Sequence, residues 1–107
     1  MTPEGKVKED ILKYFKKLQD QGIPLFYERR QAGGFSYKKG LPDIYFVYNG
    51  KHIELELKAK DGKPSGMQLM WQRKFKELYN IDDYIVESVD EVRQIIENLS
   101  TKKDMLN

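Results

Sequence analysis

Apolar and polar positions recur with two different periods along the chain, and the change of period separates helices from strands. A period near 3.6 predicts three helices, over residues 3–21, 65–79 and 91–99. Shorter apolar stretches predict four strands, over residues 23–29, 42–48, 51–58 and 83–89. This order, αβββαβα, predicts an α/β (α+β) fold in which helices flank a central sheet.

The two middle strands are joined by Asn49-Gly50, the strongest sequence signal for a two-residue hairpin turn. Such a turn pairs Tyr48 with Lys51, and counting outward along both strands pairs Asp43 with Glu56. Alternate residues of a strand share a face, so this register brings the apolar residues of both strands together on one face. The two carboxylates then lie opposite each other on the other face.

Like charges placed opposite each other across a hairpin lower stability unless a cation lies between them. Asp43 and Glu56 form such a pair, and Lys58 lies one step further along the same face. Oxygen ligands favour Mg²⁺ or Mn²⁺, which would polarise a phosphate and lower the pKa of a bound water. Lys58 would orient that water or neutralise the developing charge. The alternative is that this charged face, Glu54 included, is simply solvated.

Composition restricts the chemistry further. The 107 residues predict one domain over 1–107, with a polar, frayed tail over 100–107. The absence of cysteine excludes disulfides, thiolate zinc sites and cysteine nucleophiles, and His52, the single histidine, argues against His-rich metal sites. His52 itself is expected to be a surface residue beside the hairpin turn. No apolar run approaches membrane-spanning length and no signal-peptide pattern is present, so we expect an intracellular, cytoplasmic protein without membrane contact.

Basic residues gather around the glycine-rich segment 30–41 and along the second hairpin strand. Although the net charge is only +2, phosphate contacts from this cluster would give sequence-independent affinity for DNA. Phe35 and Tyr37 lie between the basic residues and add a weak indication of the same kind. The alternative is that these are ordinary solvating charges. The predicted DNA-binding residues are Arg29, Arg30, Lys38, Lys39, Lys60 and Lys63.

The same residues carry a family resemblance. Pro42-Asp43 followed by Glu56-Leu57-Lys58 resembles the signature of the PD-(D/E)XK nucleases. A longer set of motifs resembles the virus-type replication-repair nuclease (VRR-NUC) branch, from Thr2 to about Leu78. These motifs are TPE at 2–4, KGLPD at 39–43, ELK at 56–58, Gln68 and Trp71.

This resemblance implies a restriction-endonuclease-like αβββαβ core with a defined set of site residues. Asp43 and Glu56 would bind the metal together with the backbone carbonyl of Leu57, and Lys58 would be the catalytic lysine. Gln68 would support the site. An acidic residue on the first helix would complete it; we expect Glu4, with Glu9 as the fallback, because Glu4 shares a helical face with the apolar residues.

Two of these motif residues have structural explanations as well. Ser65 and Gln68 match the capping box, in which both side chains satisfy free N–H groups at a helix start. Trp71 belongs to the apolar stripe of the same helix and is expected to be a core residue rather than a base-stacking group. Tyr45 shares the face of Asp43, where it would either touch substrate or pack on the sheet.

The resemblance implies a Mg²⁺- or Mn²⁺-dependent, structure-selective DNA endonuclease. Its substrates would be branched DNA such as Holliday junctions, it would act as a homodimer, and it is compatible with phage origin. One alternative is a non-catalytic DNA-binding module that retains the fold. Another is a small α/β interaction domain with a solvated charged face.

Overall fold

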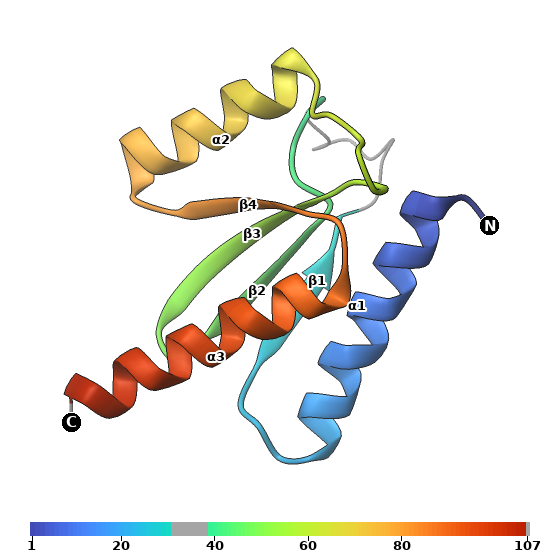
Figure 1. The fold of residues 1–107 in the computed structure, drawn as a ribbon. Helices are drawn as coiled ribbons and strands as arrows, with labels where there is room; N and C mark the ends of the chain where they lie inside the picture. Colours follow the sequence, from blue (N-terminus) through green and yellow to red (C-terminus); the bar gives the residue numbers. More distant parts are fainter. Residues whose placement is uncertain (31–38, 107) are drawn as a thin grey trace.

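The computed structural model describes residues 1–30 and 39–106, and the side chains of residues 1–30 and 39–100. Within this part of the chain the secondary structure follows the predicted order, and the predicted fold class is confirmed (Figure 1). The elements are α1 (Pro3–Asp20), β1 (Phe26–Arg29), β2 (Ile44–Tyr48), β3 (Lys51–Leu57), α2 (Gly66–Tyr79), β4 (Asp82–Val86) and α3 (Val89–Leu106).

The four strands form one mixed sheet in the order β1-β2-β3-β4. The first three strands are antiparallel neighbours, whereas β4 runs parallel to β3. A parallel neighbour requires a crossover connection, and α2 supplies it. Figure 1 shows the sheet between α2 on one side and α1 and α3 on the other.

The predicted hairpin register is confirmed. Asn49 and Gly50 have φ values of 52° and 76°, the left-handed conformation that a tight two-residue hairpin turn requires. Tyr48 pairs with Lys51, and the ladder continues outward to the pair of Ile44 with Leu55. The next pair in this ladder is the one that brings Asp43 to Glu56.

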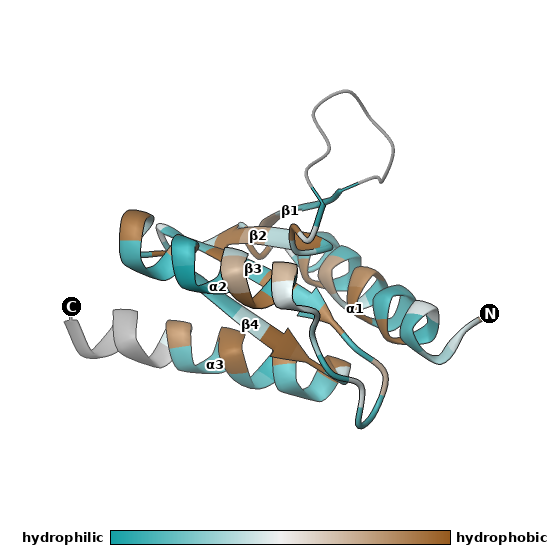
Figure 2. Ribbon diagram, turned by 90° about the horizontal axis from the view of Figure 1, so that it is seen from above, coloured by the Kyte–Doolittle hydropathy of each residue, from teal (hydrophilic) through white to brown (hydrophobic). Residues whose placement is uncertain are grey.

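The apolar core lies on one face of the sheet, under α1 and α3. Each helix carries an apolar stripe along a polar surface (Figure 2), and these stripes pack against the apolar face of the strands. Fully burying side chains of this size contributes roughly 1.5–3 kcal/mol each. The buried apolar residues are Ile11, Phe15, Leu18, Leu25, Ile44, Phe46, Ile53, Leu55, Leu57, Val86, Val92 and Ile96.

Helix α2 differs from the prediction, which placed its apolar stripe in the core. No residue of α2 is buried, and Leu78 is 65% exposed. The physical reason lies in the surface beneath the helix. α2 packs mainly on the edge strand β4, and the sheet face on its side carries acidic residues, so its stripe is at most partly buried.

Helix α3 is longer than predicted and continues through Leu106, taking in most of the segment expected to be a frayed tail. Conversely, β1 begins at Phe26 and β4 ends at Val86, so both strands are shorter than their apolar stretches. None of the described helices is long and apolar enough to cross a bilayer.

Candidate active site

Asp43 lies immediately before β2, where the end of the hairpin meets the middle of the sheet. Its backbone N–H donates to the carbonyl of Leu55 (3.1 Å), which extends the β2–β3 ladder by one residue. Its carboxylate accepts a hydrogen bond from the backbone N–H of Leu57 (3.2 Å). Asp43 is therefore held by β3 on both sides of Glu56, and its side chain shares the face of the Glu56 side chain.

Glu56 is a buried acid in an unfavourable environment. Its side chain is 2% exposed, and its Oε1 atom has no hydrogen-bond partner among the described residues. Burial raises the pKa of Glu56 well above its usual range, and the neighbouring Asp43 carboxylate raises it further. Lys58 acts in the opposite direction but does not offset these effects. Lys58 therefore does not compensate the repulsion between the carboxylates of Asp43 and Glu56.

Lys58 follows directly on β3, and its backbone N–H donates to the carbonyl of Val86 on β4 (2.9 Å). Its side chain is only 15% exposed, and its Nζ atom lies 3.9 Å from Oε1 of Glu4. The structure therefore brings the first turn of α1 to the lysine. Glu9, the fallback for the helix acid, is instead paired with Lys13 one turn along α1 (2.9 Å).

The start of α2 fixes the chain segment that enters β2. The indole N–H of Trp71 donates to the carbonyl of Lys39 (3.1 Å). Gly40 has φ +88°, and a Cβ atom at this position would lie 2.6 Å from Cβ of Met67. Both the backbone conformation and the close approach to α2 therefore require glycine three residues before Asp43.

Gln68 forms the capping box that the sequence predicts. The Ser65 backbone N–H donates to Gln68 Oε1 (2.7 Å), and the Gln68 N–H donates to Ser65 Oγ (3.2 Å). The box uses the side-chain oxygen and leaves the amide nitrogen available as a donor. A supporting function of Gln68 in the site remains a prediction.

The donor set fits a hard divalent cation in part. The carboxylates of Asp43 and Glu56 lie close together, and Oε1 of Glu56 has no hydrogen-bond partner among the described residues. The Leu57 carbonyl is the predicted third ligand, and this function remains a prediction. No group of three His, Cys, Asp or Glu side chains in the described part of the chain is arranged to hold a metal ion. Backbone oxygen and water would therefore have to complete the coordination of Mg²⁺ or Mn²⁺.

The basic residues predicted to contact DNA have different surroundings. Four of them are exposed: Arg29, Lys39, Lys60 and Lys63. Arg30 instead forms an ion pair with the buried Glu54. Lys38, together with Phe35 and Tyr37, lies outside the described residues. The function of each as a phosphate contact remains a prediction.

Comparison with solved structures identifies the fold. A solved structure described as a VRR_NUC domain superimposes with a TM-score of 0.69 and 23% sequence identity, covering 91% of this chain and 97% of that one. The fold is that of a VRR_NUC domain. No family model matches the sequence. No curated protein matches it either.

On this VRR_NUC fold, the charged face of the sheet carries a polar network that sequence reasoning missed. The alternative in which Glu54 is solvated is wrong, because Glu54 is 1% exposed and both its oxygens bind the guanidinium of Arg30. His52, expected at the surface, is half-buried; its Nε2 contacts Glu54 and its ring stacks on Tyr45, with 4.8 Å between centroids. The hydroxyl of Tyr45 in turn donates to Glu28.

Arg30 connects this network to the approach to Asp43. Its Nη1 donates to the carbonyl of Pro42 (3.0 Å), and its backbone N–H donates to the carbonyl of Asp43 (2.9 Å). Arg30 therefore contacts the backbone on both sides of the Pro42–Asp43 peptide bond, while Glu54 holds its guanidinium. The sequence offered no separate signal for this network, because Glu54 alternates with apolar residues in the same way as His52 and Glu56.

Asp83 is a second buried acid on the same face of the VRR_NUC sheet. It pairs with Glu54 across β3 and β4, and its Oδ1 atom has no hydrogen-bond partner among the described residues. Burial raises the pKa of Asp83 to about 7, and the charge of Glu54 adds to this effect. Across the sheet from β1 to β4, this face is therefore built around acidic side chains.

We expect Glu56→Gln to stabilise the metal-free protein at alkaline pH. Because the folded-state pKa is raised, the folded protein retains a proton that the unfolded chain has lost, so wild-type stability falls as pH rises above about 4.5. Glutamine removes this titration. The variant should gain about 1–3 kcal/mol in the free energy of unfolding at pH 8, and the gain should shrink towards pH 5.

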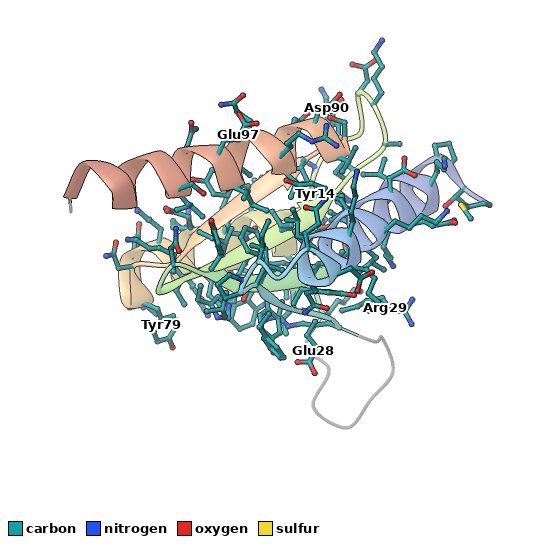
Figure 3. All side chains as sticks on the ribbon, turned by 90° about the horizontal axis from the view of Figure 1, so that it is seen from below. Tyr14, Glu28, Arg29, Tyr79, Asp90 and Glu97 are labelled. Atoms are coloured by element: carbon teal, nitrogen blue, oxygen red, sulfur yellow. The ribbon has the colours of Figure 1, made fainter. Side chains whose placement is uncertain are left out.

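Urea unfolding in EDTA at pH 5 and pH 8 measures this difference. Asp83, whose charge also raises the pKa of Glu56, is present in both proteins. Glu97→Gln, at an exposed position of α3 (Figure 3), is the matched control and should stay within about 0.5 kcal/mol of wild type at both pH values. A Glu56→Gln protein that is less stable than wild type at pH 8 would contradict the proposed repulsion.

Proposed function

We propose that this chain is a metal-dependent, structure-selective DNA endonuclease that hydrolyses phosphodiester bonds. The observation that carries the proposal is the carboxylate pair of Asp43 and Glu56, which share one face at the end of the hairpin with Lys58 beside them. The likeness to a VRR_NUC domain supports a nuclease-type fold for DNA processing.

In the proposed site, the acidic side chains would bind the metal and Lys58 would contact the reacting groups. Asp43 and Glu56, with the Leu57 carbonyl, would hold Mg²⁺ or Mn²⁺. Such a cation supplies Lewis-acid polarisation of a phosphate and a lowered pKa of a coordinated water. Lys58 would donate to the attacking water or to the phosphate oxygens as negative charge develops, and Glu4 would orient its ammonium group.

Branched DNA, including Holliday junctions, is the substrate class we propose for this site. One site per chain cuts one strand, so paired cuts in a junction require two copies related by a two-fold axis. We propose a homodimer for this reason. Strand β4 is an edge strand with the partly exposed Tyr84, and with α3 it offers a surface on which a second copy could pack.

A non-catalytic DNA-binding module is the second candidate. It is favoured by one observation, the lack of a third acidic or histidine ligand near Asp43 within the described residues. Against it stands the presence of Asp43, Glu56 and Lys58 together, because a protein that only binds DNA gains nothing from a buried carboxylate that a second carboxylate repels.

The test is a cleavage assay with purified protein on labelled four-way junction, flap, nicked and single-stranded DNA. We expect cleavage of at least one branched substrate with Mn²⁺ or Mg²⁺, none in EDTA, and slower cleavage of unbranched duplex. Circular dichroism checks that the protein is folded in each condition. A folded protein that binds DNA but leaves the junction and the flap uncut in both metals would support the binding module.

A further inference from the structure

Outside the candidate active site, a positively charged concave surface runs along α1. A groove of about 770 Å³ follows one face of this helix and is bordered on the strand side by Arg29 of β1. Figure 3 shows Arg29 projecting beside α1. The lining of the groove includes Lys8, Lys13, Lys16 and Lys17 of α1, with Leu12 between them, and Arg29 of β1.

The positive charge of the protein is concentrated in this groove. Five cationic side chains and two carboxylates line it, which gives the groove a net charge of +3, whereas the whole chain carries +2. Both carboxylates are used internally, since Glu9 binds Lys13 and Asp20 binds Lys16, each at 2.9 Å. Lys8, Lys17 and Arg29 have no ion pair among the described residues, so their charges are available to a ligand.

The groove starts at the N-terminal end of α1, the end of the helix that also brings Glu4 to Lys58. Gly5, at one end of its lining, directly follows Glu4, whose carboxylate lies 3.9 Å from Lys58. From Gly5 to Gln21, the residues that line the groove span about 24 Å along the helix axis at 1.5 Å per residue. Lys8 and Lys17 are separated by about 14 Å along the axis and, being nine residues apart, project from opposite sides of the helix, so they border the groove on its two sides.

We propose that this α1 groove binds the sugar–phosphate backbone of the duplex that flanks the cut site. Two unpaired cations of α1, Lys8 and Lys17, and a third on β1, Arg29, surround the groove and complement the negative charge of a DNA strand. The methylene stems of the lysines and Leu12 supply an apolar wall against which the sugars pack. The inference rests on the proposed nuclease function for its substrate, but the contact itself requires no cleavage.

The experiment compares two charge-reversed proteins. Lys8→Glu/Lys17→Glu alters the groove, and Lys51→Glu/Arg73→Glu alters two exposed cations on β3 and α2 that also lack an ion pair among the described residues. Both double variants change the net charge by the same amount, so long-range electrostatics is matched. Binding of a fluorescein-labelled 20-base-pair duplex is measured by anisotropy in EDTA at several salt concentrations.

For the groove variant we expect binding about 10–100-fold weaker near 0.1 M salt, and a log–log salt slope smaller by about two. The control variant should bind within about threefold of wild type and keep the slope. Equal losses in the two variants would overturn the proposal, since net charge alone would then explain the binding. The proposal also fails if the groove variant binds duplex normally but loses binding to anionic phospholipid vesicles.

Parallel cleavage assays separate this inference from the proposed function. The groove variant should cleave a junction more slowly at low DNA concentration and at the wild-type rate when DNA is saturating, because Lys8 and Lys17 take no part in the chemistry. If wild type cleaves nothing while the groove variant still loses duplex binding, the nuclease proposal fails and the groove stands. If wild type cleaves and the groove variant binds duplex DNA normally, the nuclease proposal stands and the groove proposal fails.

Discussion

Replacing Lys58 with alanine should lower the single-turnover cleavage rate about 10³-fold while DNA affinity stays within about threefold of wild type. A cation aimed at charge that develops only in the transition state contributes to the rate and little to ground-state binding. Lys58 suits this function because its side chain is 15% exposed and its Nζ lies 3.9 Å from Glu4, at the edge of the carboxylate pair.

Single-turnover cleavage of a labelled junction in Mn²⁺, with affinity measured separately in EDTA, tests the prediction. The matched control is Lys60→Ala, which removes the same charge from an exposed position two residues further along. It should alter affinity modestly and leave the rate at saturation unchanged. The assignment of Lys58 would be wrong if Lys58→Ala cleaved within tenfold of the wild-type rate, or if both variants lost activity equally.

Glu54→Ala should destabilise the fold by about 3–4 kcal/mol. Removing one partner of a buried ion pair leaves the other charge uncompensated, which typically costs 3–5 kcal/mol, whereas an exposed pair contributes at most about 1 kcal/mol. Here the guanidinium of Arg30, which is 24% exposed, would lose both of its carboxylate contacts. For a domain of this size, the loss corresponds to a melting temperature lower by about 15 °C or more.

Urea unfolding at pH 7.5 measures this effect, with Glu28→Ala as the matched control. Glu28 lies on the same sheet face but is exposed, so its removal should cost about 1 kcal/mol or less. The double variant Arg30→Met/Glu54→Leu should recover most of the stability lost in Glu54→Ala, because it replaces both charges with apolar groups. An equal loss in the free energy of unfolding for Glu54→Ala and Glu28→Ala would contradict the prediction, because the buried pair would then stabilise the fold no more than the exposed one.

The same double variant separates stability from the arrangement of the site. Without its guanidinium, residue 30 no longer contacts the carbonyl of Pro42 just before Asp43. We therefore regard Arg30 as a positioning residue. A folded double variant should bind Mn²⁺ more weakly than wild type, as measured by calorimetry, although neither replaced residue belongs to the proposed ligand set.

The sequence was sufficient to predict the hairpin and therefore the carboxylate pair. A two-residue turn leaves a single register, and that register fixes which side chains share a face without knowledge of the rest of the fold. The approach of Glu4 to Lys58 was also within reach, since helical periodicity turns Glu4 towards the sheet.

What the alternation of residues could not show is whether a face is covered. Glu54 alternates with apolar residues as a solvated residue would, and its burial depends on Arg30 from β1 and on the parallel pairing with β4. Both contacts join segments far apart in the sequence. Asp83 was missed for the same reason. The sequence predicts the strand that contains Asp83, but it does not show that this strand pairs with β3. The exposure of α2 follows, since an apolar stripe is buried only where an apolar surface faces it.

The position of β3 between a hairpin partner and a strand from near the end of the chain has a consequence for folding. The hairpin is a local structure that forms within microseconds once both strands are available. The backbone of Lys58, in contrast, is held by Val86, 28 positions later in the chain, and such distant pairings form slowly. During synthesis the acidic half of the candidate site would form before its lysine is anchored, so the complete candidate site would be among the last parts of the protein to form.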